Sequence, residues 1–328
     1  MERKPKRASI LVTGAPRTGT TFAGALLGLA RGVGVIFEPF HPDAGVAGIT
    51  GEMLDNGLEP LAAPLRVEFP FITADHLLAP RFDRLYRDAI AGRAAYQRPQ
   101  YPGRHGRVTA LARRLFTSRL ALQNRWAAAW PFHNRWIVKD PHLCLASEHV
   151  HRAMGAPCLV TIRHPLATAE SWTRLGWNPD LRQFWRQTAL WERHLRGLPQ
   201  PDQDFLSPLQ RAAYAWLWIH KVLLDFGQRN PDMMFVRLED AAREPVPTFR
   251  ALYERLGLVF DARIENAIRA RTEAKTDAVG TRERPHQLRR DSRSVVESWK
   301  GRLSEADQAA VRRIVSATAA AWYPEEAW

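Results

Sequence analysis

Two segments of the chain combine arginine and hydroxyl side chains in a spacing that suits a phosphate-like anion. The first, GAPRTGTT at residues 14–21, follows an apolar run and precedes an apolar helical pattern. A strand, a glycine turn and a helix in this order place backbone N–H groups at a helix N-terminus, where an anion is favoured. Thr20 stands where the pattern G-x-x-x-x-G-K-[ST] has its lysine, and the cation of the turn is Arg17. The segment therefore predicts an anion site without the lysine of ATP-using enzymes.

The second segment is VTIRHPLATAESW at residues 160–172. Its apolar start predicts a strand that ends at Ile162, and Pro165 suits the first turn of a following helix. Arg163 then lies at the end of the strand, and Ser171 lies on the helix. An arginine and a hydroxyl together suit a terminal phosphate monoester. The alternative is a structural use of both residues, with Arg163 in an ion pair and Ser171 facing solvent.

Short apolar runs that alternate with helical patterns position these segments. The runs are mostly continuous, which is typical of parallel strands buried on both faces, so we expect a three-layer αβα fold with a central parallel sheet. Ligands of such sheets lie beyond the carboxyl ends of the strands. The predicted strands are 9–13, 33–37, 135–139, 157–162 and 233–238. The predicted helices are 20–31, 143–154, 165–177, 207–229 and 246–257, with a further capped helix from Ser304.

Residues 50–134 carry no strand pattern and predict a helical, basic insertion between the second and third strands. From 89 to 139 the chain has ten Lys or Arg and no Asp or Glu. A basic amphipathic helix is expected from the spacing of four residues, Leu111, Leu115, Leu122 and Trp126. We expect the insertion to shape the site of a second substrate. A solvated basic face is the alternative.

Composition restricts the class of protein. The 328 residues are 45% hydrophobic, which is enough for a sizeable core, and the net charge of +13 favours an anionic partner. The two cysteines form no disulfide framework or zinc spacing, so a reducing, cytoplasmic location is the simpler expectation. The basic start is not a signal peptide, because Pro16 and Arg17 interrupt its apolar run. No apolar stretch approaches the ~18 residues that a membrane span needs.

Together the two anion-binding segments resemble the sulfotransferases that use 3′-phosphoadenosine 5′-phosphosulfate (PAPS). The form P-R-T-G-T-T is most similar to the branch that contains tyrosylprotein and many bacterial sulfotransferases. The resemblance covers roughly 9–41, 135–177 and 233–305 and implies a P-loop-like nucleotide fold, a single domain over 1–328 and no metal. The resemblance explains why the turn has no lysine, because the charge of a sulfuryl group needs less neutralisation than that of a γ-phosphoryl group. The implied donor-binding residues are Arg17, Thr18, Gly19, Thr20, Thr21, Arg163, Ser171, Ser294, Trp299 and Lys300.

The resemblance also implies catalytic residues, namely Arg17, Glu38 and Lys139. Glu38 follows the second predicted strand in VIFEPFHP and is the implied base that removes the proton of the acceptor hydroxyl. Lys139, in WIVKDPH, matches the K-D-P stretch of the family and would stabilise charge on the leaving phosphate oxygen. His41 is the second candidate for the base. Ion pairs that only support the structure are the alternative for both charged residues.

The match is less regular in two places. His164 stands where the family often has an aspartate after the arginine, and Arg17 replaces the lysine of the enzymes that act on phenols and steroids. The C-terminal stretch RRDSRSVVESWKGRLS resembles the segment that folds over the nucleotide, with Ser292, Ser294, Trp299 and Lys300 as candidates. Trp299 also suits core packing.

Two other functions stay open from the residues alone. The first is a P-loop kinase of small molecules that uses ATP and Mg²⁺. The second is a nucleotide- or membrane-binding protein without catalysis, which has no need of Glu38. As acceptor we expect a hydroxyl on a glycan or glycolipid, which suits Trp126, Trp130 and Trp136; a peptide tyrosine and a small metabolite are alternatives. Peripheral contact with an anionic membrane is expected, and no nucleic acid partner.

Overall fold

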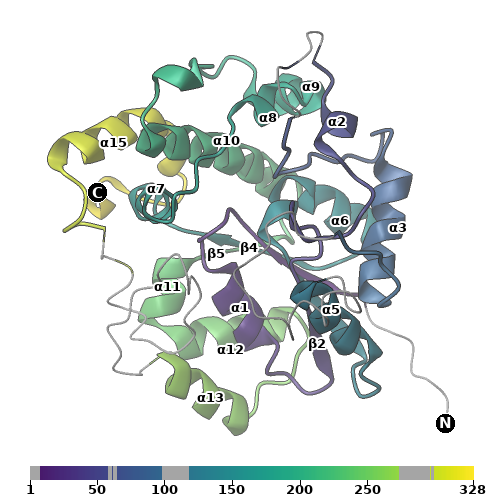
Figure 1. Cartoon of the computed structure of the whole chain (residues 1–328). Helices are drawn as coiled ribbons and strands as arrows, with labels where there is room; N and C mark the ends of the chain where they lie inside the picture. The colour runs from purple at the N-terminus through teal and green to yellow at the C-terminus, as the bar shows by residue number, and fades with distance from the viewer. Residues whose placement is uncertain (1–7, 58–60, 62–64, 98–117, 273–295, 297–298) are drawn as a thin grey trace, which may run out of the picture.

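A five-stranded parallel sheet forms the centre of the protein, for which we obtained a computed structural model (Figure 1). The structure describes residues 8–57, 61, 65–97, 118–272, 296 and 299–328. The strand order is β2-β3-β1-β4-β5, and every pair is parallel. The strands are β1 (Ile10–Thr13), β2 (Val33–Phe37), β3 (Arg135–Lys139), β4 (Cys158–Ile162) and β5 (Met234–Arg237). All five predicted strands are confirmed to within a residue at each end.

Helices cover both faces of the sheet. The side chains of each strand alternate between two apolar cores, one on each face. Leu11 lies in one core, whereas Ile10 and Val12 lie in the other. The helices on the first face are α6 (Ser147–Met154), α7 (Pro165–Arg174), α10 (Pro208–Arg229) and α15 (Glu305–Ala319). Those on the second face are α1 (Thr20–Leu27), α11 (Leu238–Arg243), α12 (Pro245–Arg255) and α13 (Ala262–Thr272). The predicted three-layer αβα fold is confirmed.

Local signals explain where these helices begin. Pro165 stands in the first turn of α7, and Ser207 forms a capping box with Gln210 at the start of α10. Ser304 caps α15, since its Oγ accepts the backbone N–H of Asp307 at 3.1 Å. The elements that follow α7 are the short helices α8 (Arg182–Trp185) and α9 (Thr188–Leu190), a π-helical turn (Trp191–Leu195) and a 3₁₀ turn (Gln203–Phe205). A 3₁₀ helix (Pro141–Ala146) precedes α6, and another (Glu325–Ala327) ends the chain.

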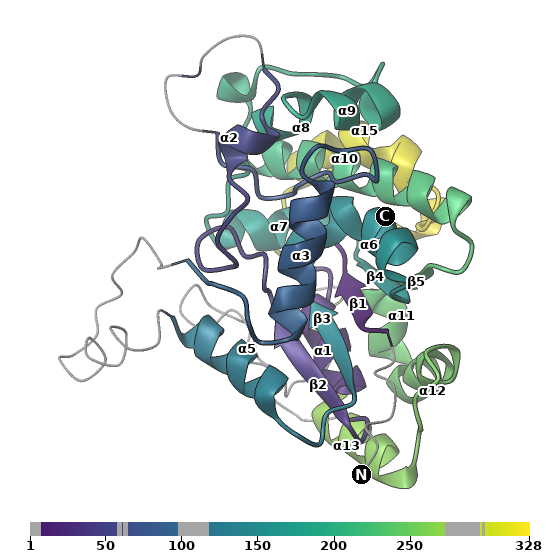
Figure 2. The same ribbon diagram turned by 90° about the vertical axis from the view of Figure 1, so that its right-hand side faces the viewer.

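The insertion between β2 and β3 is helical in its described parts, as predicted, and it packs beside the sheet edge (Figure 2). Its helices are α2 (Gly51–Leu54), α3 (Ala79–Ile90) and α5 (Arg119–Ala129). β2 is an edge strand, and the amide of Asn124 on α5 satisfies it by bonding the backbone N–H and C=O of Phe37 at 2.7 and 2.8 Å. The insertion thereby protects an edge that would otherwise be open to pairing.

The expected amphipathic helix of the insertion differs from the structure. Leu111 and Leu115 lie outside the described residues. Ala121 and Asn124 form the buried face of α5, while Leu122 and Trp126 are exposed. The leucine–tryptophan pattern was therefore misleading, because Asn124 bonds Phe37 of β2 and Ala121 packs in a small apolar cluster with Ala89 of α3. Trp136 also belongs to the buried sheet rather than to the surface of the insertion. In the part of the chain that the structure describes, no helix has the length and apolarity to cross a membrane.

Candidate active site

The turn at residues 14–19 connects β1, in the middle of the sheet, to α1. Gly14 has φ 136°, and a Cβ there would lie 2.2 Å from the backbone oxygen of Thr161 on β4, so only glycine allows this close approach. Gly19 caps α1 in the left-handed conformation. Strand order reverses around β1, which has β3 on one side and β4 on the other. The turn therefore stands at the switch point where open parallel sheets bind ligands.

Arg17 links the two anion-binding segments that the sequence predicted. Its Nε donates a hydrogen bond to Ser171 Oγ on α7 at 3.3 Å, and its backbone oxygen accepts one from Arg163 Nη1 at 3.3 Å. The loop is fixed further by Trp172, whose indole N–H donates to the oxygen of Pro16 at 2.8 Å. The structure thus brings Arg17, Arg163 and Ser171 together, although 154 positions separate the first from the last.

The threonines of the turn have different environments. Thr18 is fully buried, and its hydroxyl bonds the oxygen of Ala15 at 2.7 Å and the hydroxyl of Thr161 at 2.8 Å. Its side chain therefore shapes the turn from within. Thr20 and Thr21 form the first turn of α1, where Thr20 is buried and Thr21 is half-buried.

Arg163 is a buried cation at the end of β4. Burial lowers its pKa from the ordinary value, and the carboxylates of Glu239 and Glu170 partly offset this effect. An arginine stays protonated under such shifts, so the positive charge is retained. Glu239 is held in place by the backbone N–H of His164 at 2.9 Å and the hydroxyl of Tyr323 at 2.9 Å. A buried positive charge at a strand end is a strong electrostatic feature for an anionic ligand.

Glu38 and Lys139 form an ion pair at the ends of the neighbouring strands β2 and β3. Lys139 Nζ donates to Glu38 Oε1 and lies 4.3 Å from the centre of the Phe37 ring. The Lys139 side chain is 2% exposed, and that of Glu38 is 14% exposed. Burial by itself raises the pKa of Glu38, but opposing effects, of which the charge of Lys139 is the largest, more than offset it, so the pKa lies below its ordinary value. Burial also lowers the pKa of Lys139, and the charge of Glu38 opposes this effect.

Two of the predicted catalytic residues have strained backbone conformations. Among the described residues, Arg17 and Glu38 are the two non-glycine residues with positive φ, at 70° and 41°. Such conformations cost ~1–3 kcal/mol and persist where the surrounding structure imposes them. The hydrogen bonds from Glu38 N to the oxygen of Lys139 at 2.7 Å, and from His41 N to the oxygen of Glu38 at 3.0 Å, fix this conformation at the end of β2.

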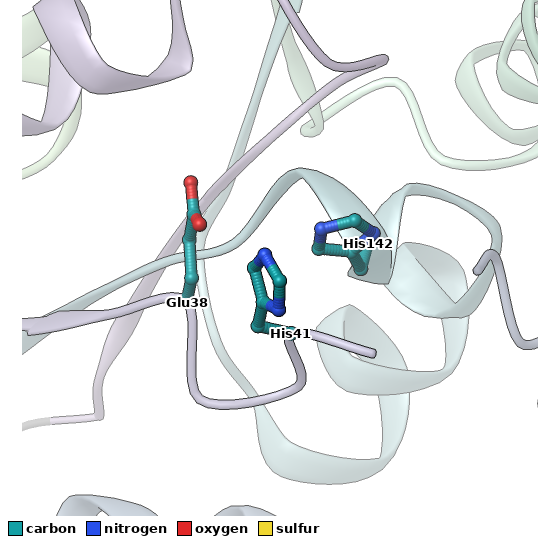
Figure 3. Close-up of side chains that lie close together, drawn as sticks. All are labelled: Glu38, His41 and His142. Atoms are coloured by element: carbon teal, nitrogen blue, oxygen red, sulfur yellow. The ribbon is translucent and has the colours of Figure 1, made fainter. Parts of the chain in front are cut away.

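Two histidines lie beside Glu38 (Figure 3). His41 comes from the loop after β2, and His142 comes from the 3₁₀ helix after β3; their ring centres are 5.2 Å apart. Each offers one nitrogen within 4.8 Å of the other and of a Glu38 oxygen, a donor set that could hold a metal ion. The ammonium of Lys139 already contacts that carboxylate, so positive charge is supplied there by the chain itself. His41 was a candidate from sequence, whereas His142 was missed; its position directly after the K-D-P stretch was the available signal.

Asp140 holds the loops at this edge together. Its carboxylate accepts the backbone N–H of Phe40 at 2.6 Å and of His142 at 2.9 Å. Burial and the neighbouring Glu38 charge raise the pKa of Asp140 to about 7. Both of its oxygens are used to connect the two segments that carry the histidines.

The C-terminal candidates lie near the arginine end of the site. Trp299 is buried, and its ring stacks on His164 with centres 5.0 Å apart and planes 5° apart. Lys300 Nζ lies 5.8 Å from the centre of the Trp299 ring, and its charge acts on His164, which is next to Arg163. Ser292 and Ser294 lie outside the described residues. Trp299 and Lys300 are thus close to the Arg163 segment, as the sequence predicted.

These features define an α/β protein with a glycine turn before α1 and a carboxylate–lysine pair at one sheet edge. Residues 9–262 match the model of the family described as the sulfotransferase family. The match spans most of the chain, and the protein belongs to the sulfotransferase family. A comparison with curated proteins finds no matching sequence.

Three solved structures are similar to the chain at low identity. The sulfotransferase domain of the Synechococcus PCC 7002 olefin synthase is 15% identical, with a TM-score of 0.44 and coverage of 97% of both chains. A sulfotransferase domain from the curacin biosynthetic pathway is 14% identical, with a TM-score of 0.42 and coverage of 96% of this chain and 98% of that one. Sulfotransferase STF9 from Mycobacterium avium is 15% identical, with a TM-score of 0.46 and coverage of 97% and 78%.

Proposed function

We propose that this sulfotransferase moves a sulfuryl group from PAPS to an acceptor hydroxyl. The observation that carries the proposal is that the charge of Arg17 acts on Lys139, which bonds Glu38, and that Arg17 and Glu38 both have strained backbone conformations. Strain of this kind is concentrated at functional sites. Family membership supports the reaction class, and the donor follows from the charges described below.

The donor would bind along the turn at 14–21. Its backbone N–H groups and Arg17 suit the 5′-phosphosulfate, and Arg163 with Ser171 suits the 3′-phosphate. These contacts support a single continuous site, because Arg163 and Ser171 both bond Arg17. Trp299 and Lys300 lie close enough to Arg163 to act on the same nucleotide. The guanidinium of Arg163 stays protonated, and a charge-assisted hydrogen bond from it to a phosphate would be a strong one.

In the transfer step, an S–O bond to the acceptor forms and the S–O bond to the donor phosphate breaks, releasing 3′,5′-adenosine bisphosphate. Glu38 takes the acceptor proton. Lys139 and Arg17 stabilise the charge that develops on the phosphate oxygen. Lys139 therefore contacts the Glu38 carboxylate first and the donor phosphate afterwards. When Lys139 moves toward the donor, the Glu38 carboxylate loses this ion pair. Burial then raises the pKa of Glu38 and makes it a better base.

The structure gives less support to a kinase that uses ATP and Mg²⁺. Asp140 directly follows β3 and is the carboxylate that the sequence offers there as a magnesium ligand. Its two oxygens accept hydrogen bonds from the backbone of Phe40 and His142, and it is fully buried. Recruiting it to a metal would break the connection between the β2 and β3 loops.

We assign the whole chain to a single sulfotransferase-like domain, in which residues 50–134 shape the acceptor site. The support is that the described part of the insertion reaches the catalytic edge. The backbone oxygen of Glu68 bonds His142 Nδ1 at 3.1 Å, and Arg66 is ion-paired with Asp43, two residues after His41. The acceptor is a hydroxyl on a glycan or glycolipid in this proposal.

An exposed aromatic cluster on the insertion is the proposed contact with an anionic membrane surface. Trp126 is 67% exposed, Trp130 42% and Phe132 74%. The ring centres of Trp126 and Trp130 are 6.0 Å apart, and those of Trp130 and Phe132 are 5.9 Å apart. Arg119 and Arg125 are exposed on α5, the helix that also carries Trp126. Aromatic side chains beside cations suit the boundary of an anionic bilayer.

Vesicle sedimentation tests this contact. We expect binding to phosphatidylcholine vesicles only after phosphatidylglycerol is added, and weaker binding for the double variant Trp126→Ala, Phe132→Ala. Phe205→Ala is the matched control, because Phe205 is an equally exposed aromatic residue outside the insertion. Absence of binding to the anionic vesicles, or equal binding of the double variant, contradicts the membrane contact.

The reaction itself is tested by measuring 3′,5′-adenosine bisphosphate release from PAPS in the presence of a panel of methyl glycosides. We expect release to depend on an added alcohol and to persist in EDTA. Consumption of ATP with Mg²⁺, and none of PAPS, would assign the chain to phosphoryl transfer instead.

A further inference from the structure

The imidazole rings of His41 and His142 lie next to Glu38, and their Nδ1 atoms bond the backbone of Asp43 and Glu68. Figure 3 shows one ring nitrogen of each histidine turned toward the space beside Glu38, while the other nitrogen of each ring points away. The three side chains come from two loops that Asp140 connects. The cluster is therefore a built feature of the sheet edge.

The bonds made by the outer nitrogens fix the tautomer of each ring. His41 Nδ1 accepts the backbone N–H of Asp43 at 3.1 Å, so in the neutral ring the proton is on Nε2. His142 Nδ1 lies 3.1 Å from the backbone oxygen of Glu68, which can only accept, so the proton is on Nδ1 and Nε2 carries a lone pair. The cluster thus presents one N–H donor from His41 and one nitrogen acceptor from His142.

Both rings stay neutral near neutral pH, which keeps these roles. Burial lowers the pKa of His142 to about 3, helped by the charge of His41, and it lowers the pKa of His41 as well. The charged groups around His41 are Glu38, Asp43, Arg66 and Lys139. The two carboxylates raise the pKa of His41 and the two cations lower it, so burial decides that the pKa is lowered.

We propose that His41 and His142 bind a second hydroxyl of the acceptor, adjacent to the hydroxyl that Glu38 deprotonates. The inference rests on the proposed sulfuryl transfer and names its substrate class, an alcohol with hydroxyls on neighbouring carbons. A hydroxyl donates to His142 Nε2 and accepts from His41 Nε2–H at the same time. A carboxylate cannot make both bonds because it has no hydrogen to donate to His142, and an ammonium cannot because it has no lone pair to accept from His41. The three side chains offer ligand atoms within 4.8 Å of one another, which suits two hydroxyls on neighbouring carbons.

The test uses cis-1,2-cyclohexanediol and cyclohexanol as matched acceptors, with PAPS as the donor. The measured quantity is the ratio of kcat/KM for the diol to that for the mono-alcohol. We expect the wild-type ratio to exceed the factor of two that comes from having two hydroxyls, and to be roughly tenfold, because an unmatched donor or acceptor in the buried pair is costly. His142→Phe and His41→Phe should bring the ratio down to about two by lowering turnover of the diol.

His76→Phe is the control for both variants. His76 Nδ1 accepts the backbone N–H of Leu78 at 3.1 Å, which is the same two-residue contact that His41 makes with Asp43. Loss of that contact alone should leave the ratio unchanged. Nitrogen-15 spectra of the wild-type imidazoles give a readout that does not depend on any variant folding. We expect an Nδ1–H tautomer for His142 and an Nε2–H tautomer for His41, with both signals moving when the diol is added.

The outcomes separate the two levels of the proposal. A diol preference no greater than the statistical factor, a preference that survives both histidine variants, or no turnover of the diol overturns the histidine inference while sulfuryl transfer to other alcohols stands. Loss of the histidine effect on adding EDTA would assign the cluster to a metal ion instead. Failure of the protein to bind 3′,5′-adenosine bisphosphate overturns the sulfotransferase proposal itself.

Discussion

Lys139 donates a hydrogen bond to Glu38 across two adjacent parallel strands, and the lysine is almost completely buried. The register pairs Phe37 with Lys139, so Glu38 follows β2 at the level where Lys139 ends β3. The stem of Lys139 packs on α1 at Gly24, where an added Cβ would lie 3.0 Å from Lys139 Cγ. A buried ammonium held by one carboxylate is available to a second anion, because that anion compensates its charge when the first bond breaks.

Replacing Glu38 by Gln should remove the base without removing the partner of Lys139, since the amide oxygen still accepts. We expect kcat to fall by ~100-fold or more, the range of general-base catalysis, with binding of 3′,5′-adenosine bisphosphate unchanged. Steady-state kinetics and calorimetry measure the two effects. Glu52→Gln, on the exposed side of α2, is the matched control. Full activity of the Glu38 variant would exclude this residue as the base.

Replacing Lys139 by Met should shift the pH dependence of the reaction. Burial raises the pKa of Glu38, and the charge of Lys139 is the largest effect that lowers it. Without the lysine, Glu38 holds its proton to higher pH, so the acidic limb of the kcat/KM profile should move upward. Lys139→Arg retains the charge and should move the limb less. An unchanged limb in the Met variant would show that Lys139 does not set the ionisation of the base.

Arg163 should determine the preference for a 3′-phosphate. We expect Arg163→Ala to lower the affinity for 3′,5′-adenosine bisphosphate by roughly 100-fold while the affinity for adenosine 5′-monophosphate changes little, because a charge-assisted bond is lost only with the first. Calorimetric titration gives both constants. Arg174→Ala, on the following helix α7, is the control, since Arg174 is ion-paired with Glu170. Equal losses for both nucleotides would assign Arg163 to folding rather than to recognition.

The buried histidines should make the protein less stable in mild acid. His220 is fully buried, stacks on Trp216 with ring centres 3.9 Å apart, and has a pKa that burial lowers to about 3 from the ordinary 6.5. Below 6.5 the unfolded state therefore binds a proton that the folded state does not, and stability is lost as the pH falls toward 3.

We expect this one residue to account for about 2 kcal/mol of the decrease in the free energy of unfolding between pH 7 and pH 5. Urea denaturation at both pH values measures it. His220→Gln should reduce the decrease by that amount, and His151→Gln, at the surface ion pair with Asp232, serves for comparison. The same decrease in the His220 variant would mean that other groups cause the acid sensitivity.

The sheet and the strand-end residues were predictable because their signals are local. Runs such as ILVT and CLVTI are largely apolar, and each is followed at once by the residues that carry chemistry, including Arg163 after β4. Parallel strands bring their ends to one edge, so Arg17, Glu38 and Lys139 meet once the order of strands is known. The sequence patterns alone contained this part of the site.

Contacts across the fold were not predictable from spacing. His142 was missed because its role depends on a tautomer fixed by Glu68, a residue of the insertion. The packing of α5 was misread because Asn124, which looks like a surface residue, bonds the edge strand β2, whereas Leu122 and Trp126 face outward. Such contacts join residues far apart in sequence, and hydrophobic periodicity carries no information about them.

The most direct test of the proposed function is a calorimetric titration with 3′,5′-adenosine bisphosphate, compared with ADP and Mg²⁺. The account predicts that the bisphosphate binds more tightly, that EDTA does not affect its binding, and that Arg163→Ala weakens it. Tighter binding of ADP with Mg²⁺ would contradict the account and assign the turn at 14–21 to a metal-dependent nucleotide enzyme.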